Sequence, residues 1–406
     1  MLKIYVCGPT VYNDPHIGNM RPIVTFDLIL KAARFLGISF EFVHNITDID
    51  DKIIKAALEN NVSEKEIATK YSESYLELLK NFNIDTVTKL EYVTENIDTI
   101  SEFISKILEN NSAYIKENNV WFDVDKNKNH YGDVSNQKLD NMLFEDLQYQ
   151  KNHPADFALW KSTTTGIKFN SPFGLGRPGW HTECAALILK NFGNQGVDIH
   201  GGGMDLTFPH HENENIQFLS VTGNPITKKW LRIGQINLNG EKMSKSLQNV
   251  ILAKDFINEY GADVLKFIFL LSSFTGTINI DEALIANVKK ILRRIKIVFF
   301  TAHKNQLINQ ETNFNSTKLA LDALYNLNFA EFNKIVNKLL KEANSGVNTE
   351  AILNIVQIFT ILQFECSKFD YSEAIQLFNH WNELKAKSDY KNADIVREQL
   401  QKLELV

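Results

Sequence analysis

The chain of 406 residues contains few cysteines and no long apolar run, and each shortage excludes a class of protein. Its cysteines are odd in number and far apart, at Cys7, Cys184 and Cys366, which argues against a disulfide framework and for a reducing compartment. No apolar run approaches the ~18 residues that a membrane helix needs, and the first residues lack the charged and apolar regions of a signal peptide. We therefore expect a cytoplasmic protein with no membrane partner.

Positive charge is also in short supply. The 43 Lys and Arg residues are outnumbered by 49 Asp and Glu residues, which gives a net charge of −6. Because phosphate backbones attract basic surfaces, this balance disfavours nucleic-acid binding by the whole molecule, and any RNA contact must use local patches. Hydrophobic residues make up 44% of the chain and charged residues 23%, which excludes wholesale disorder. The length allows about two to four domains.

The first 43 residues alternate between strand and helix patterns. A β-branched run from Lys3 to Cys7 breaks at a Gly-Pro pair, helical spacing runs from Pro22 to Leu36, and a second strand-like run follows at 39–43. Strand, helix and strand form the minimum parallel unit. The expected fold class is therefore α/β, with a doubly wound parallel sheet of the Rossmann type.

Later segments predict an insertion and a helical end. Helical spacing dominates residues 63–112, with short strand candidates at 120–122 and 157–160, and we interpret this region as an α+β connective insertion rather than more of the sheet. Sheet and helix patterns alternate again near 184–238, and nearly everything from 281 onward is helical. We expect the sheet domain in two halves, at 1–62 and 171–240, with the insertion at 63–170 between them. A lysine-rich loop with the helices after it is expected at 241–300, and an all-α end at 301–406.

Two thiols, one imidazole and one carboxylate form a four-coordinate set that suits zinc, namely Cys7, Cys184, His210 and Glu214. The last two are four residues apart after the helix-starting Pro209, so both fall on one helical face. Cys7 ends the first strand, where doubly wound sheets place their ligands. Spacing alone leaves another interpretation open, in which the cysteines are buried packing residues and His211, Glu212 and Glu214 are solvated.

A polar segment between the first strand and the first helix is a candidate phosphate-binding turn. It reads His16-Ile17-Gly18-Asn19, and such a helix start lets phosphate reach backbone N–H groups and the positive end of the helix dipole. His16 would donate to a phosphoryl oxygen as charge builds there. A plain turn with a helix cap is the alternative.

A strand that runs into three glycines is a candidate nucleoside-binding segment. Residues 198–205 read Asp-Ile-His-Gly-Gly-Gly-Met-Asp. Gly202 and Gly203 let the backbone lie flat against a nucleoside, and the carboxylate of Asp205 suits ribose hydroxyls. A bare glycine turn is the alternative.

Two lysines three residues apart follow a strand and an Asn-Gly turn. They stand in Glu-Lys-Met-Ser-Lys-Ser, residues 241–246, where Lys242 and Lys245 would form a movable positive clamp for a leaving pyrophosphate. An exposed hairpin tip is the alternative.

In this order, the segments resemble class I aminoacyl-tRNA synthetases, and specifically the cysteinyl-tRNA synthetases. The first signature, His-Ile-Gly-His or His-Ile-Gly-Asn in the family, stands at 16–19, and the second, Lys-Met-Ser-Lys-Ser, at 242–246. The subtype is carried by four longer segments, at 5–12, 45–52, 177–184 and 208–214. The resemblance covers residues from about 3 to about 300 and continues more loosely through the helical end.

The resemblance implies one Zn²⁺ per chain, held by the four candidate ligands, which binds the thiolate of the substrate cysteine. Serine is nearly isosteric with cysteine, so a hydrophobic pocket would reject it by only ~10²-fold. A soft thiolate is a far better zinc ligand than a neutral hydroxyl, and such selection removes the need for an editing domain. The implied cysteine-binding residues are Cys7, Thr47, Trp180, Cys184, His210 and Glu214.

The implied reaction is the ATP-dependent ligation of L-cysteine to tRNA(Cys), with Mg²⁺ bound to ATP. The cysteine carboxylate attacks the α-phosphate and gives cysteinyl-adenylate and pyrophosphate, and a hydroxyl of the terminal tRNA adenosine then takes the cysteinyl group and releases AMP. The implied catalytic residues are His16, Asn19, Lys242 and Lys245. The implied ATP-binding residues are Gly8, His16, Gly18, Asn19, Gly202, Gly203, Asp205, Lys242 and Lys245.

A basic segment at 289–296 is expected to contact the tRNA stem. Lys289, Arg293 and Lys296 share one helix face there, and a solvated face is the alternative.

The sequence departs from the family pattern at several places. Asn19 replaces the second histidine of the first signature, Arg232 stands where the family commonly has a histidine near the nucleotide, and Gln248 stands where glycine is usual. Both ends are short for the family, so either anticodon reading is weakened or those parts are not represented in this sequence.

Two other functions stay open. A related ligase of the mycothiol pathway shares the cysteine pocket but passes cysteine to an amino sugar and lacks an anticodon domain. A catalytically silent paralogue that binds RNA or zinc is the second alternative. The helical stretch 281–406 favours tRNA as acceptor, and the intact His16, Lys242 and Lys245 argue against a silent paralogue.

Overall fold

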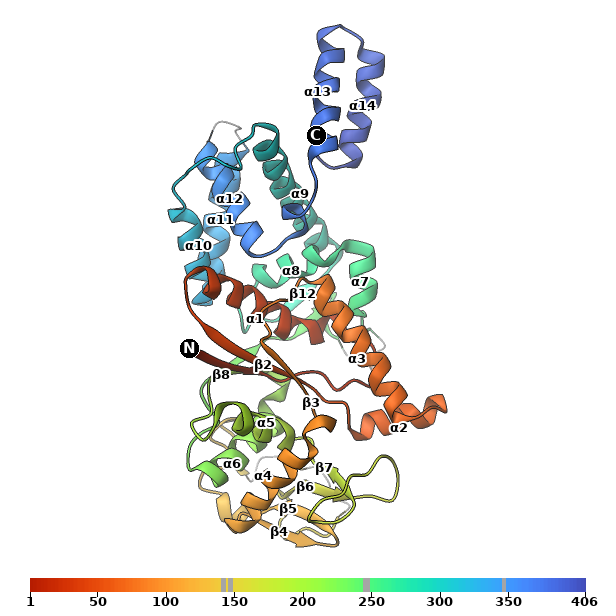
Figure 1. Ribbon diagram of the computed structural model, residues 1–406, viewed down its shortest axis with the longest axis vertical. Helices are drawn as coiled ribbons and strands as arrows, with labels where there is room; N and C mark the ends of the chain where they lie inside the picture. The colour runs from red at the N-terminus through yellow and green to blue at the C-terminus, as the bar shows by residue number, and fades with distance from the viewer. Residues whose placement is uncertain (140–143, 145–148, 244–248, 345–347) are drawn as a thin grey trace. The chain divides into compact units, whose positions relative to one another are not determined.

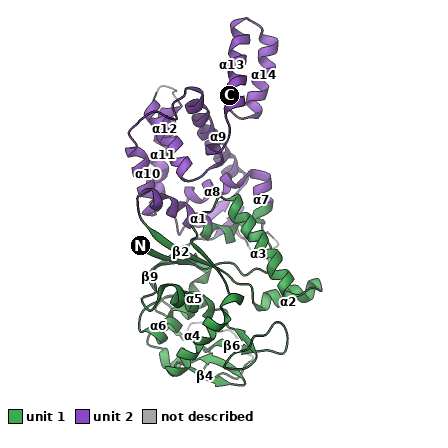
Figure 2. Cartoon of the chain, viewed as in Figure 1, with its two compact units in different colours: residues 1–23, 39–235, 251–254 green, residues 24–38, 236–250, 255–406 purple. Residues whose placement is uncertain are grey.

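The computed structural model describes residues 1–139, 144, 149–243, 249–344 and 348–406. The chain divides into two compact units (Figure 2). Unit 1 comprises residues 1–23, 39–235 and 251–254, and unit 2 comprises residues 24–38, 236–250 and 255–406.

Unit 1 is built on a five-stranded parallel sheet, which confirms the expected α/β fold class (Figure 1). The strands, in their order across the sheet, are β3 (Lys89–Tyr92), β2 (Phe40–Ile46), β1 (Leu2–Val6), β8 (Val197–Gly203) and β9 (Thr227–Ile233). Ile4, Tyr5 and Val6 of the central β1 have no exposed surface, as expected for a strand covered on both faces. The strand order reverses between β1 and β8, so their carboxyl ends flank the crevice where such sheets bind ligands.

Strand β3 was missed in the sequence, because we expected helices throughout residues 63–112. The two helices before it are α2 (Asp51–Asn60) and α3 (Glu64–Asn81), and β3 then pairs in parallel with β2. Its alternating charges, Lys89 and Glu91, disguise the strand pattern. Glu91 is nevertheless buried, because its carboxylate pairs with Lys89 at 2.7 Å and with Lys190 at 3.2 Å.

A second, antiparallel sheet follows α4 (Ile97–Glu109). Its four strands are β4 (Ala113–Lys116), β5 (Asn119–Phe122), β6 (Phe157–Ser162) and β7 (Gly176–Pro178). The rings of Phe122 and Phe157 stack with their centroids 5.0 Å apart, and Trp160 is fully buried. These apolar contacts belong to one core that also includes residues of β1 and of α5 (Thr182–Phe192).

The last sheet pattern of the segment 184–238, at residues 233–238, is split in the structure. Strand β9 ends at Ile233 and β10 begins at Ile236, and the carbonyls of Gly234 and Gln235 between them accept hydrogen bonds from the Arg21 guanidinium, at 2.6 and 2.9 Å. Arg21 is 2% exposed, so these carbonyls satisfy a buried cation.

Unit 2 combines a small sheet with a largely helical remainder. The sheet has β10 (Ile236–Leu238) between β11 (Glu241–Lys242) and β12 (Ile278–Ile280). The helices of residues 253–402 are α7 (Ala253–Tyr260), α8 (Ala262–Leu271), α9 (Glu282–Lys304), α10 (Asn315–Tyr325), α11 (Phe329–Ala343), α12 (Thr349–Ile361), α13 (Ser372–Ala386) and α14 (Tyr390–Lys402). Helix α1 (Ile17–Phe35) and α7 each contribute residues to both units. Across the described ranges, no helix is both long and apolar enough to cross a membrane.

Candidate active site and metal cluster

Four buried donor atoms converge at the carboxyl end of β1. Cys7 follows β1 directly, Cys184 lies in the first turn of α5, His210 lies in the short helix η5 (Thr207–His211), and Glu214 lies in α6 (Glu212–Thr222). From Cys7 Sγ, the distances are 3.8 Å to Cys184 Sγ, 3.6 Å to His210 Nε2 and 3.4 Å to Glu214 Oε1. The four ligand atoms lie within 4.8 Å of one another.

This donor set fits a zinc ion. Two thiols, an imidazole and a carboxylate are typical zinc ligands, and bonds of about 2.0–2.3 Å put the donors of a tetrahedral site about 3.3–3.8 Å apart. The three distances from Cys7 and the 3.8 Å between Cys184 Sγ and His210 Nε2 match that spacing. His210 Nε2 and Glu214 Oε1 are closer, at 2.7 Å, because they form an ion pair.

The charges in the cluster favour a cation. A hydrogen bond from Cys7 lowers the pKa of the Cys184 thiol to about 7. Burial alone would raise the pKa of Glu214, but His210 and His200 hold it well below its usual value. Burial alone would lower the pKa of His210, but Glu214 raises it to about 10. A thiol that ionises near neutrality and an ionised carboxylate therefore share one buried site with a protonated imidazole, whose proton a bound metal ion would replace.

A second donor set overlaps the first and was missed in the sequence. Cys7 and Glu214 also converge with His200 of β8 and with His211, both fully buried. His200 Nε2 lies 2.6 Å from Glu214 Oε2, and the His200 ring stacks on Trp230 with centroids 4.6 Å apart. The signal was available in the strand ending Asp-Ile-His-Gly, but a side chain's face is known only once the sheet order is known.

The wall beside the cluster is held by buried hydrogen bonds. The Thr47 hydroxyl donates to Glu183 Oε2 at 2.8 Å, and the Asn45 amide donates to Thr47 Oγ1 at 3.2 Å. Asn45 Oδ1 in turn accepts from the backbone N–H of Gly8 at 2.8 Å. A Cβ added at Gly8 would lie 1.6 Å from the Asn45 carbonyl oxygen, so only glycine fits this approach. Thr47 and Gly8 are residues that the sequence predicted for the site, whereas Asn45 and Glu183 were not predicted.

Trp180 lies beside the cluster. Its ring stacks on that of His210 with centroids 4.6 Å apart, and Lys52 Nζ lies 5.2 Å from the Trp180 ring centroid. The stacking fixes the plane of the imidazole, and the cation contributes positive charge to the same region.

The segment 16–19 forms the start of α1. The His16 backbone N–H donates to Asn19 Oδ1 at 3.1 Å, and the Asn19 N–H approaches His16 Nδ1 at 3.2 Å. His16 and Gly18 are half-buried and Asn19 is exposed. The two side chains thus bond to the first turn of a helix, whose N–H groups and dipole suit an anion.

The glycine run ends β8 next to His211, one of the two histidines of the second donor set. A Cβ at Gly202 would lie 3.0 Å from His211 Nε2, and one at Gly203 would lie 2.3 Å from Asp205 Oδ1. Asp205 is exposed. Glycine therefore keeps this strand end open for a flat ligand.

Lys242, the first lysine of the loop, belongs to unit 2. Lys242 lies in β11, where it pairs with Asn237 of β10. Lys245 and Gln248 lie outside the described residues.

Arg232 of β9 anchors a loop of the insertion. Its guanidinium donates to the Val134 carbonyl at 3.3 Å and lies 5.0 Å from the Trp230 ring centroid. The Glu212 carboxylate accepts from three backbone N–H groups of the same loop, those of Gly132, Val134 and Ser135. Arg232 and Glu212 therefore tie residues 132–135 to the elements that carry the cluster, a role that sequence analysis did not foresee.

The three basic side chains that we expected to contact the tRNA stem already have partners within unit 2. Lys289 Nζ lies 4.7 Å from the Tyr260 ring centroid, and Lys296 Nζ lies 5.0 Å from that of Phe369. Arg293 donates to the Val406 carbonyl at 2.8 Å.

The class of protein follows from comparison with known families and folds. A family model described as the class I (C) tRNA synthetase catalytic domain matches residues 1–290. Methionyl-tRNA synthetase of Mycobacterium tuberculosis, solved with methionyl-adenylate, has the same fold, with a TM-score of 0.61 at 14% identity over 89% of this chain and 90% of that one. The chain is thus similar to class I aminoacyl-tRNA synthetases in sequence and fold.

Relatives identify the subtype. The cysteine–tRNA ligase of Mesomycoplasma hyopneumoniae strain J is 43% identical over 99% of this chain and 97% of its own length. That of Malacoplasma penetrans is 40% identical over 100% of this chain and 95% of its own. The chain belongs to the cysteine–tRNA ligase family, as the resemblance of its motifs predicted.

Proposed function

We propose that the chain ligates L-cysteine to tRNA(Cys) through a cysteinyl-adenylate intermediate and releases pyrophosphate and AMP. The observation that carries this proposal is the convergence of Cys7, Cys184, His210 and Glu214 at the carboxyl end of the central strand. Family membership supports aminoacylation, and the donor set supports cysteine as the amino acid.

In the proposal, Cys7, Cys184, His210 and Glu214 hold Zn²⁺, which supplies a soft Lewis acid that prefers a thiolate to a hydroxyl. Metal binding requires deprotonated thiols and a neutral imidazole, so it would displace protons from Cys7 and His210. Trp180 and the pair formed by Thr47 and Glu183 would shape the pocket around the amino acid.

The first turn of α1 would receive the ATP phosphates. The helix N-terminus, with His16 and Asn19 bonded across it, would stabilise charge on the α-phosphate as the cysteine carboxylate attacks and pyrophosphate leaves. Mg²⁺ would accompany the ATP. The nucleoside is assigned to Gly8, Gly202, Gly203 and Asp205, which line or follow the strand ends. Lys242 and Lys245 are assigned to the leaving pyrophosphate.

The helical end of unit 2 is assigned to tRNA. The relatives match this chain over nearly its whole length, which includes that end. Lys289 and Lys296 keep their ammonium groups against aromatic rings, and Arg293 is partly engaged, so we assign them a supporting role in phosphate contact.

The decisive experiment measures cysteine-dependent ATP–pyrophosphate exchange and then the transfer of labelled cysteine. We expect exchange with zinc-loaded protein and transfer to tRNA(Cys), but no transfer to glucosaminyl-inositol. Exchange with transfer to the amino sugar alone would identify the mycothiol-type ligase. Absence of exchange with zinc-loaded protein would leave a catalytically silent paralogue as the remaining interpretation.

A further inference from the structure

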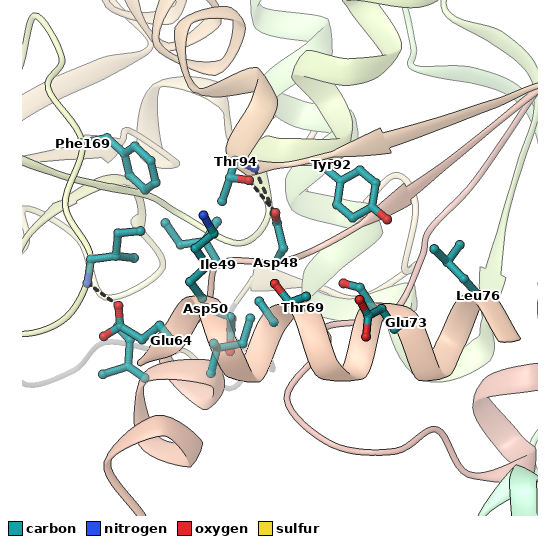
Figure 3. A pocket seen from close by; sticks show the side chains of 16 residues that line it. Asp48, Ile49, Asp50, Glu64, Thr69, Glu73, Leu76, Tyr92, Thr94 and Phe169 are labelled. Carbon is teal, nitrogen blue, oxygen red and sulfur yellow. Dashed lines mark hydrogen bonds between the residues drawn. The ribbon is translucent and has the colours of Figure 1, made fainter. Parts of the chain in front are cut away.

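Unit 1 contains a cavity of about 490 Å³ whose lining includes none of the residues assigned to zinc, cysteine or ATP (Figure 3). Its walls come from the segment that follows β2, from α2 and α3, from the end of β3, and from residues 167 and 169. Cavities of roughly 300–1,000 Å³ are typical of small-molecule sites. The volume is therefore large enough for a ligand of one ring and a short chain.

One wall is a face of α3. Glu64, Ala68, Ser72 and Leu76 are four residues apart and line the cavity together, and Lys65, Thr69 and Glu73 form the adjoining stripe. Figure 3 shows Asp48, Tyr92 and Thr94 facing this helix across the space. The remaining surface is apolar and comes mostly from Ile49, Ile53, Ile54, Ile167 and Phe169.

The polar lining is strongly acidic. Among the described residues that line the cavity, four are acidic, namely Asp48, Asp50, Glu64 and Glu73, and one, Lys65, is basic. Within the described ranges, no ion pair joins any of the four carboxylates to a lysine or an arginine. The wall thus carries a negative charge that no described side chain neutralises by direct contact.

The hydrogen bonds to these carboxylates come from neutral groups. Asp48 Oδ1 accepts from the Thr94 backbone N–H at 2.9 Å, and Glu64 Oε2 accepts from the Ile167 N–H at 2.8 Å. Asp50, the N-cap of α2, accepts from the Lys52 N–H at 2.8 Å. These bonds fix the carboxylates in place but supply no counter-charge. Burial raises the pKa of Asp48 and of Asp50, although the charges of Lys52 and Arg177 act on Asp50 in the opposite direction.

This chemistry excludes several ligands. Phosphates, and therefore ATP and tRNA, would be repelled by four carboxylates. A bare metal ion is disfavoured too, because the metal-type clusters among the described residues do not include these carboxylates. A cavity with apolar surface and an acidic wall, whose lining has more carboxylates than cations, instead complements a ligand that has an apolar body and one positive charge.

We propose that this cavity binds an amphipathic organic cation, a small molecule in which a ring or branched alkyl group is joined to an ammonium group. The apolar body would pack against the isoleucines and Phe169, and the ammonium group would lie against the carboxylates of Asp48 and Asp50. None of the lining residues is assigned a role in the proposed ligase reaction, and the neighbouring Thr47 directs its hydroxyl to Glu183.

The test is calorimetric titration and ligand-observed NMR of the full chain, without ATP or tRNA, with three probes of one size. These are 2-phenylethylamine, 2-phenylethanol and 3-phenylpropionate, which carry a positive, no and a negative charge. We expect saturable binding of the amine, weaker binding of the alcohol and no binding of the acid. Equal affinity for amine and alcohol, or no saturable binding of the amine, would overturn the proposal.

Matched variants locate the binding. Asp50→Asn removes one charge but keeps a good helix cap, and we expect it to weaken amine binding about fivefold and leave the alcohol unchanged. Ala68→Phe fills the cavity and should abolish binding of both probes. Glu77→Gln removes an exposed charge from α3 outside the cavity and should change nothing.

Unfolding midpoints confirm that each variant folds. Amine affinity that is unchanged in both Asp50→Asn and Ala68→Phe would place the site elsewhere and overturn the assignment. Binding of a lysine-rich peptide, with none of the small probes bound, would overturn it in favour of a protein partner.

Discussion

Nε2 of His200 lies 2.6 Å from Oε2 of Glu214, and both side chains are fully buried. The other carboxylate oxygen, Oε1, faces Cys7 and His210. His200 therefore orients Glu214, because it bonds to Oε2 and leaves Oε1 directed at Cys7 and His210. Partners of this kind fix the geometry of metal ligands in proteins.

Replacement of His200 should weaken metal binding. We expect His200→Ala to lower zinc affinity by about 10–100-fold, because Glu214 loses the group that orients it. Competition with a coloured chelator measures the affinity, and His380→Ala, at an exposed histidine of unit 2, is the control. Unchanged zinc affinity in His200→Ala would show that Glu214 does not depend on this hydrogen bond.

Loss of a proposed zinc ligand should raise the KM for cysteine far more than the KM for ATP. We expect Cys184→Ser and His210→Ala to lower bound zinc and to raise the KM for cysteine much more than the KM for ATP, because the metal is assigned to the thiolate alone. Metal analysis and pyrophosphate exchange provide the two measurements. Cys366→Ser, at a cysteine of unit 2 outside both donor sets, is the control and should behave as wild type. Active wild-type protein without zinc would refute the ligand assignment.

The hydroxyl of Thr47 should matter for stability. Thr47→Val removes the donor to Glu183 while it keeps the shape, and an unsatisfied buried group of this kind costs about 1–3 kcal/mol in the free energy of unfolding. Thr47→Ser keeps the hydroxyl and is expected to lose less. Denaturant unfolding of the three proteins measures the difference, and a larger loss in Thr47→Ser than in Thr47→Val would mean that the methyl group, and not the hydroxyl, accounts for the stabilisation.

Glu91 should make the protein sensitive to acid. Burial alone would raise its pKa, but Lys89, Asn191, Asn96 and Lys190 hold it at about 2, whereas an unfolded glutamate has a pKa of about 4.3. The folded pKa is the lower one, so the stabilisation is present above pH 4.3 and is lost as the pH falls toward 2. We expect Glu91→Gln to lower the unfolding temperature at neutral pH and to flatten its decline below pH 4.3.

Glu95→Gln, at an exposed position close by, is the control for the acid profile. If Glu91→Gln and wild type lose stability in parallel between pH 5 and pH 2.5, the ion pairs of Glu91 do not account for acid sensitivity.

The sequence predicted most of what local patterns determine. The chain order of strand, helix and strand predicted the parallel sheet, and the i, i+4 spacing of His210 and Glu214 predicted that they share a face. Their approach to Cys7 could be inferred because β1 ends there.

What the sequence did not reveal depends on distant partners. Lys89 and Glu91 look unlike a strand because Lys190, about a hundred residues later, is needed to neutralise the buried carboxylate. Asn45 and Glu183 gain their importance only through Gly8 and Thr47, which the fold brings to them. The face of β8 that carries His200 is determined by sheet register, which no single strand encodes.

The contact between Gly8 and the Asn45 carbonyl also limits which substitutions the wall beside the donor cluster accepts. A side chain at position 8 would have to push apart two neighbouring strands, so libraries that randomise it would return mainly misfolded protein. Substitutions at Trp180 would act differently, because its contact with the imidazole of His210 is made by the side-chain ring and not by the backbone.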